Sequence, residues 1–198
     1  MKTTLLKISF IFLFLSLIGA GCEKDEELLW EISPDSETSV IQKEVDGIEF
    51  KFCLLNENGE PTSVFNEGEN FTFQFSFKNN TPDTVVVTPE FINDDFFRVY
   101  QVVDSKQKDL GKPYDGIWCE YVAIFNYFKL KTKETGGLQC PWVSLEGEAT
   151  RPFCVSNRRN FLQQGDYFTQ IKLDFHYNTN SKERNIKAIV LKINFQIK

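Results

Sequence analysis

Hydrophobic and polar residues alternate along most of the chain after Val40, with the period of two that is typical of β-strands. The clearest segment is NFTFQFSFK, in which every second residue is a phenylalanine. One face of this segment carries Phe71, Phe73, Phe75 and Phe77, and the other carries Thr72, Gln74, Ser76 and Lys78. Because burial of each phenylalanine is worth about 1.5–3 kcal/mol, we expect this strand to be a main support of the core.

The C-terminal third repeats the alternation in two segments that flank the polar stretch NTNSKERN. Their apolar faces consist of Tyr167, Ile171, Leu173, Phe175 and Tyr177 in the first segment, and of Ile189, Leu191, Ile193, Phe195 and Ile197 in the second. These two segments predict a terminal β-hairpin. Earlier, Asp46-Gly47 stands between VIQKEV and IEFKFCL, and this dipeptide is a strong signal for a two-residue hairpin turn.

About seven to nine short strands separated by turn signals favour an all-β fold, an antiparallel β-sandwich. Residues 117–128 leave the type of element open. There Tyr121, Ile124, Phe125 and Phe128 are spaced three and four apart, as on a helix. Their aromatic and β-branched neighbours favour a strand.

Two segments resemble parts of immunoglobulin-like domains. GDYFTQIKL resembles the corner that enters strand F, where a glycine lies two residues before a tyrosine whose hydroxyl bonds back to the turn. These residues are Gly165 and Tyr167. FSFKNNTPDTVVV is similar to many bacterial immunoglobulin-like modules, including an intracellular proteinase-inhibitor family. The resemblance implies an immunoglobulin-like β-sandwich.

The N-terminus has the pattern of a secretory signal peptide. Lys2 and Lys7 are followed by the apolar run ISFIFLFLSLI, residues 8–18, and then by the small residues of GAG. A membrane-spanning helix needs about 20 apolar residues, so this run is too short to be an anchor. We therefore expect residues 1–21 to be removed on export.

The residues around Cys22 predict a lipid anchor. GAGC resembles a bacterial lipobox, in which signal peptidase II cleaves before a cysteine whose thiol carries diacylglycerol. Gly19 stands where the lipobox usually has leucine, and the small residues would also permit ordinary cleavage after Gly21. Lipidation of Cys22 implies palmitate and related acyl chains on the mature protein.

The charged run EKDEE follows directly. It resembles the export signal of surface lipoproteins in Bacteroidota-type bacteria, and Lys24, Asp25 and Glu26 are the residues that match it. This resemblance implies an outer-membrane location with the chain facing the cell exterior, and the alternative is anchoring on the periplasmic side. A run of five charges also predicts a solvated tether.

Charge and length narrow the remaining choices. The formal net charge of −6 becomes −8 once the two lysines of the leader are removed, and the largest basic cluster is Arg158-Arg159. A nucleic acid is therefore excluded as a partner. The length suits one domain on a tether, so we expect a signal peptide at 1–21, a lipidated acidic tether at 22–39 and a β-sandwich at 40–198.

The chain has five cysteines, and lipidation of Cys22 leaves an even number for disulfides in an oxidising compartment. Four cysteines allow three connectivities. We favour Cys140 with Cys154, which bracket a loop rich in turn formers, and Cys53 with Cys119. The alternative is that all four stay reduced and buried. A metal site is not expected, because the chain has no CxxC pair and a single histidine.

No catalytic motif is present, so we expect neither an enzyme nor a cofactor. The chain lacks G-x-S-x-G, H-E-x-x-H and a phosphate-binding loop. His176 and Asp174 share a strand face as an acid–base pair would, but Lys172 and Gln170 on that face indicate a solvated surface. Asp94-Asp95 is adjacent in sequence, and its side chains should point apart in an extended segment.

The aromatic residues between Tyr114 and Trp142 are the candidate ligand platform. The five residues of this platform are Tyr114, Trp118, Tyr121, Tyr127 and Trp142. Exposed aromatic rings stack on sugars or anchor protein interfaces, whereas a sandwich also buries a tryptophan at its centre. Separately, Asp83-Thr84-Val85 resembles the O-glycosylation acceptor of Bacteroidota-type bacteria, which makes Thr84 a candidate for that modification.

The sequence thus predicts a lipid-anchored cell-surface module that binds a glycan or a protein without catalysis and touches the membrane through its lipid alone. The first alternative is a proteinase inhibitor, which requires a rigid protruding loop at 105–116 or 178–185. The second is a structural component of a surface assembly, which requires an unprotected edge strand or a detachable terminal strand.

Overall fold

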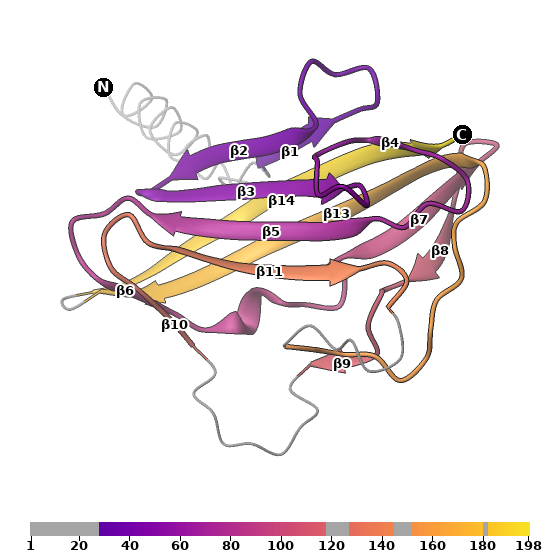
Figure 1. Ribbon diagram of the computed structural model, residues 1–198. Coiled ribbons are helices and arrows are strands. Elements are labelled where there is room, and N and C mark those ends of the chain that lie inside the picture. The colour runs from indigo at the N-terminus through magenta and orange to yellow at the C-terminus, as the bar shows by residue number, and fades with distance from the viewer. Residues whose placement is uncertain (1–27, 118–126, 145–151, 180–181) are drawn as a thin grey trace, which may run out of the picture.

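The computed structural model describes residues 28–117, 127–144, 152–179 and 182–198, and within them the protein is a β-sandwich of two sheets (Figure 1). The larger sheet has eight strands: β1 (Leu28–Ile32), β4 (Val64–Phe65), β6 (Val85–Val87), β7 (Arg98–Val103), β8 (Lys106–Gly111), β10 (Phe128–Leu130), β13 (Gly165–Asn178) and β14 (Glu183–Ile197). The smaller sheet has the order β11 (Thr135–Pro141), β5 (Thr72–Asn79), β3 (Ile48–Leu55) and β2 (Val40–Val45). The predicted all-β sandwich is confirmed.

Smaller elements close the side of the sandwich that lies below β11 in the view of Figure 1. The strands β9 (Gly116–Ile117) and β12 (Phe153–Cys154) pair with each other, and a short 3-10 helix, η1 (Pro89–Phe91), precedes β7. Phe91 of η1, Phe153 of β12 and Phe96, between η1 and β7, all belong to the core. No helix in the part of the chain that the structure describes is long and apolar enough to cross a membrane.

The phenylalanine face of β5 lies against the larger sheet as predicted. Phe71, Phe73, Phe75 and Phe77 are all buried. Phe73 stacks on Phe97 with ring centroids 4.8 Å apart, and Phe77 packs edge-to-face on Phe175 of β13 at 5.1 Å. The two sheets are thus joined by contacts between aromatic rings, which prefer stacked or edge-to-face geometries.

Both predicted hairpins are present. β13 pairs with β14 antiparallel from Gly165↔Ile197 to Asn178↔Glu183, with one register irregularity between Leu173 and Phe175. The predicted apolar faces of the two strands are buried. Between β2 and β3, Asp46 and Gly47 both have positive φ, 51° and 77°, as a type I′ turn requires.

The strand count and the polarity of the sheets differ from the prediction. The described residues form fourteen strands rather than seven to nine, because several elements of two or three residues carry no periodic pattern. β1 and β4 both pair with β14 in parallel, so the larger sheet is mixed and not purely antiparallel. β14 pairs in parallel with β1 and β4 and antiparallel with β13. Alternation of apolar and polar residues does not reveal the direction of a strand's partners.

The predicted tether, residues 22–39, is too long. β1 lies inside it and pairs with β14 from Leu28↔Ile189 to Ile32↔Ile193, so the folded part begins no later than Leu28. The sequence LLWEI follows the acidic run directly, and only Ile32 of its five residues is buried. With one buried residue in five, this segment lacks the alternation of apolar and polar residues by which a strand is recognised in a sequence.

Candidate functional site

The cysteine pairs predicted from the sequence are wrong, because Cys53 and Cys140 are both buried thiols. Cys53 faces the outer side of the smaller sheet, where its thiol donates to Oε1 of Gln74 at 3.4 Å, and burial raises its pKa. Cys140 belongs to the core on the other side of the same sheet, with its thiol 3.7 Å from the carbonyl oxygen of Pro141. Cys154 is disulfide-bonded.

The aromatic platform is also corrected, because two of its five members are buried. Tyr114 and Trp142 are each only 3% exposed. The Tyr114 hydroxyl donates to the carbonyl of Phe96 at 3.0 Å, and the Trp142 indole donates to the carbonyl of Asn160 at 2.9 Å. Both rings therefore serve the core, and burial raises the pKa of Tyr114.

Other predicted site residues have different outcomes. Tyr127 is 44% exposed and can still contribute to a surface. Thr84 is half-buried just before β6. The lipidation and export residues Cys22, Lys24, Asp25 and Glu26 lie outside the described residues, as do Cys119, Trp118 and Tyr121.

The predicted acid–base pair is present as a contact on the surface. Nε2 of His176 lies 3.1 Å from Oδ1 of Asp174, and both side chains are partly exposed on the outer face of the larger sheet. The next outward residue, Lys172, is also exposed. This pair lies on an open strand surface and lines none of the grooves described below.

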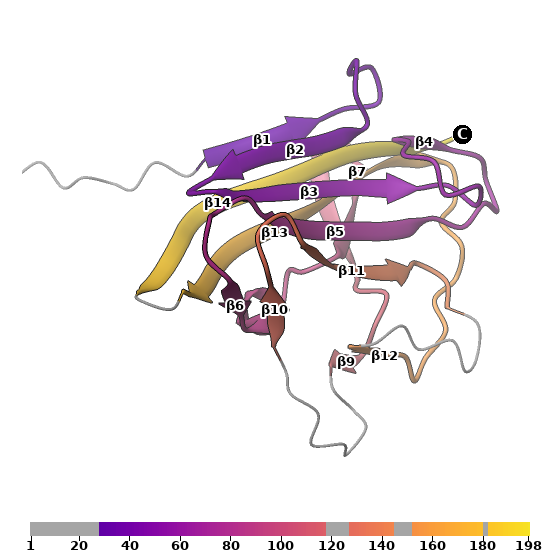
Figure 2. The same cartoon turned by 60° about the vertical axis from the view of Figure 1, so that its left-hand side comes forward.

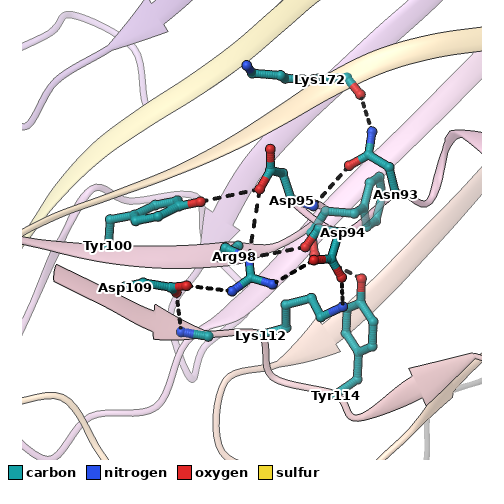
Figure 3. A network of polar contacts seen from close by, with 11 residues as sticks. Asn93, Asp94, Asp95, Arg98, Tyr100, Asp109, Lys112, Tyr114 and Lys172 are labelled. Carbon is teal, nitrogen blue, oxygen red and sulfur yellow. Dashed lines mark hydrogen bonds and ion pairs between the residues drawn. The ribbon is translucent and has the colours of Figure 1, made fainter. Parts of the chain in front are cut away.

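A network of charged groups surrounds Arg98 at the start of β7 (Figure 3). Its guanidinium lies 2.7 Å from Oδ2 of Asp109 and 3.3 Å from Oδ2 of Asp94, and its Nε donates to the carbonyl of Asp94 at 3.1 Å. The carboxylate of Asp95 lies 3.8 Å away and accepts a hydrogen bond from Tyr100 at 3.3 Å. Arg98 thus ties the turn before β7 to β8.

Lys112 extends this network. Its ammonium lies 2.9 Å from Oδ1 of Asp94 and 5.1 Å from the centroid of the Tyr114 ring (Figure 3). The hydrogen bond from Lys112 holds the pKa of Asp94 below its ordinary value. Lys112, Asn93 and Tyr114 also line a small cavity of about 170 Å³.

The network is best explained as a structural clamp. Within the described residues no group of three or more His, Cys, Asp or Glu side chains could hold a metal ion, and the three aspartates are engaged by Arg98 or Lys112. Phe97, just before Arg98, has a φ of 61°, a left-handed conformation that is costly for a bulky residue. The charges around Arg98 and the buried ring of Phe97 hold this turn in place.

The outer face of the smaller sheet offers a more suitable binding surface. A groove of about 450 Å³ runs over β5 and β11, and a neighbouring groove of about 600 Å³ shares Gln74 and Gln139 with it. The side chains that line these grooves are mostly uncharged and polar: Asn70, Thr72, Gln74, Ser76, Thr135 and Gln139. Amides and hydroxyls of this kind can donate and accept hydrogen bonds.

Sequence reasoning missed this surface, because its residues are simply the polar half of two alternating strands. The one signal is Gly136-Gly137 near the start of β11. A Cβ at Gly137 would lie 3.0 Å from the carbonyl oxygen of Phe75, so a side chain at this groove-lining position would be tightly crowded. A glycine inside a strand often marks such a close approach.

Asp115 was also missed. Its Oδ2 accepts backbone hydrogen bonds from Ser156 at 2.6 Å and Asn157 at 2.9 Å, and its own N–H donates to the carbonyl of Cys154 at 2.8 Å. Burial alone would raise the pKa of Asp115, but the two backbone N–H groups outweigh it and lower the pKa. Asp115 therefore fixes the segment after β12 against the segment before β9.

Comparison with known proteins adds no functional information. No family model and no curated protein matches the chain. A solved structure of a beta-glucosidase from Listeria innocua in complex with gluconolactone is similar over 75% of this chain and 17% of that one, with 12% identity and a TM-score of 0.24. A likeness this weak carries no argument.

Proposed function

We propose that this chain is a lipid-anchored cell-surface protein that presents a non-catalytic binding surface. Support for the anchor comes from the signal peptide pattern, from GAGC at residues 19–22 and from the charged run that follows. The lipid on Cys22 attaches the chain to the outer membrane, and Lys24, Asp25 and Glu26 direct it to the exterior.

The position of β1 makes the tether short. Only residues 23–27 separate Cys22 from Leu28, the first residue of β1. Six residue steps span at most about 20 Å, so the sandwich stays close to the membrane. β11 lies at the opposite edge of the smaller sheet from β2, which runs beside β1 (Figure 2). An anchor before β1 therefore leaves β11 and its groove uncovered.

The observation that carries the binding role is the uncharged polar groove over β5 and β11. Gln74 and Gln139 project from neighbouring strands, and their register places them opposite each other. A pair of amides flanked by hydroxyls matches the hydroxyl groups of a neutral glycan or the backbone of an extended peptide. The burial of Tyr114 and Trp142 removes two members of the aromatic platform and leaves this groove as the better surface.

The inhibitor alternative gains no support from the proposed loops. Residues 106–111 form β8, paired with β7, and residues 183–185 belong to β14. Residues 106–111 and 183–185 are therefore strand residues and do not form projecting loops. Glycosylation of Thr84 remains a prediction for the exported protein.

Metabolic labelling tests the anchor. Cells that express the full chain are fed an alkyne analogue of palmitate, and the purified protein is probed for the label. The wild-type chain should be labelled, and Cys22→Ala should lose the label because the acylated thiol is gone. Cys53→Ala is the matched control and should keep it. Equal labelling of the wild type and Cys22→Ala would contradict lipidation at this residue.

Binding to a neutral glycan array tests the groove. The full chain should be retained on one or more neutral oligosaccharides, and the double variant Gln74→Ala/Gln139→Ala should lose retention because it removes the paired amides. Gln170→Ala, on the other sheet, should bind like the wild type. Retention that persists in the double variant would exclude the groove as the glycan site.

A further inference from the structure

β11 has an open edge. Its register with β5 continues at both ends, where the N–H of Trp142 donates to the carbonyl of Phe71 and the N–H of Asn79 donates to the carbonyl of Glu134. Backbone groups in an antiparallel pair point alternately toward and away from the partner strand. In β11 the N–H and C=O groups of the even-numbered residues therefore point toward β5. The N–H and C=O groups of Thr135, Gly137 and Gln139 therefore point away from the sheet.

Nothing in the described residues covers these groups. Thr135, Gly137 and Gln139 are exposed, and β5 is the one strand with which β11 pairs. The outward backbone groups of these residues accept and donate no other backbone hydrogen bond within the described ranges. In the two views of the sandwich β11 forms the lower border of its sheet (Figures 1 and 2).

Other edge strands of the molecule carry charges that discourage strand pairing. β8 exposes Lys106, Lys108 and Asp109, and β2 exposes Lys43 and Glu44. Charged side chains on an edge strand, lysine above all, protect it against pairing with another chain. β11 has no charged residue between Thr135 and Pro141. Of the described edge strands with five or more residues, β11 is therefore the one without a charged side chain.

We propose that the open edge of β11 binds the same edge of a second copy of this chain, in antiparallel orientation about a two-fold axis at Gly137. This register places Thr135 opposite Gln139 of the second copy and Gly137 opposite its counterpart. The three facing pairs are of the hydrogen-bonded type and supply about six backbone hydrogen bonds. An interface related by a two-fold axis uses the same patch twice, as this one does.

The charges at the two ends of β11 match this arrangement. Lys131, Lys133 and Glu134 precede the strand and are all exposed, so this end carries a net positive charge. At the far end, Glu57 accepts a hydrogen bond from the N–H of Asn70, whose side chain donates to the carbonyl of Val143. An antiparallel pair brings the lysine end of one copy to the glutamate end of the other. Charge complementarity therefore favours a second copy in this direction.

Pairing at β11 joins the two smaller sheets into one continuous sheet and joins their polar grooves across the two-fold axis. The two β1 strands then lie at the outer edges of the pair. Two tethers can therefore reach one membrane that runs parallel to the sheets. The pairing goes beyond the proposed anchor and does not depend on it.

Disulfide trapping in intact cells tests this register on the full chain. Thr135→Cys/Gln139→Cys places the new thiols opposite each other at a Cα separation of about 5.5 Å, within disulfide range. Oxidation should give a species of twice the chain mass on a non-reducing gel. Gln139→Cys alone should not, because the two copies of residue 139 would lie about 14 Å apart along the strands.

Three results would overturn the proposal: a double variant that stays monomeric, a single variant that cross-links as efficiently, or cross-linking to a different protein. The thermal midpoint of each variant under reducing conditions verifies the fold, since both side chains are exposed.

A charge-pair experiment provides an independent measurement. Thr135→Lys/Gln139→Lys places like charges opposite each other in the pair, whereas Thr135→Lys/Gln139→Glu places opposite charges there. Sedimentation of the full chain in detergent should show dimerisation weakened about five- to tenfold in the first variant and retained in the second. Equal dimerisation of both variants, or a monomeric wild type, would overturn the pairing of 135 with 139.

Discussion

The hydroxyl of Tyr167 donates a 2.7 Å hydrogen bond to the backbone carbonyl of Gln163, four residues earlier in the chain. Gly165, two residues before the tyrosine, has a φ of 154° and allows the turn that brings the carbonyl within reach. The ring of Tyr167 is buried and stacks on Phe195 of β14 at 5.5 Å. The hydroxyl thus bonds back to the backbone a few residues upstream, as the sequence GDY predicts, which is the geometry of a tyrosine corner.

Replacing this tyrosine by phenylalanine tests the corner. Tyr167→Phe keeps the stacked ring but leaves the Gln163 carbonyl without its donor, so the free energy of unfolding should fall by about 1 kcal/mol. Tyr100→Phe is the matched control, because its hydroxyl makes a longer, 3.3 Å bond to Asp95, and it should cost less than about 0.5 kcal/mol. Urea denaturation of the two variants measures both values, and equal losses would contradict a special role for the corner.

The stability of the sandwich should depend on acid through Asp115. The backbone N–H groups of Ser156 and Asn157 lower the pKa of this carboxylate in the folded protein. A lowered folded pKa gives stability that is present above the unfolded value of about 4 and is lost as the pH falls through the folded pKa. Because Asp115 is exposed, this contribution should not exceed about 1 kcal/mol.

Urea denaturation at pH 7 and at pH 3 compares Asp115→Asn with the wild type. The variant should be less stable at pH 7 and should lose less stability between the two pH values, because its amide does not titrate. Asp35→Asn, at an exposed position, should follow the wild type. If Asp115→Asn and the wild type lose the same stability between pH 7 and pH 3, Asp115 is not the group responsible.

The fold could be predicted where apolar and polar residues alternate along a long strand. It could not be predicted where contacts between segments far apart in the sequence determine the structure. β5 and the β13–β14 hairpin were recognisable because their apolar residues recur at every second position and bury one face. β9 and β12 have two residues each, and they are held together beside Asp115, whose role appears only when Ser156, 41 positions further along the chain, comes into contact with it. Periodicity carries no such information.

The burial of Tyr114 and Trp142 shows the same limit for the site. An aromatic residue in an irregular segment can lie in the core or on the surface, and its hydrogen-bond partner decides which. The partners are the carbonyls of Phe96 and Asn160, in segments that the sequence does not connect to these rings. The polar groove over β11 could not be predicted either, because uncharged polar residues in a binding groove give the same sequence pattern as those on an ordinary solvent-exposed strand face.

The disulfide of Cys154 gives a further prediction. Cys53 and Cys140 are thiols, and Cys22 carries the lipid in the proposed function, so we expect Cys119, outside the described residues, to be the partner of Cys154. Non-reducing peptide mapping of the exported protein should yield a fragment that joins residues 119 and 154. A 140–154 or 53–119 fragment would contradict both this prediction and the buried positions of the two thiols.

Surface display is the central claim, and protease treatment of intact cells tests it most directly. In a Bacteroidota-type host, added protease should digest the wild-type chain while a periplasmic marker stays intact. The variant with Lys24, Asp25 and Glu26 all changed to alanine should remain anchored but become protected, because its export signal is lost. A wild-type chain that stays protected in intact cells, and is digested only after the outer membrane is opened, would contradict display on the cell surface.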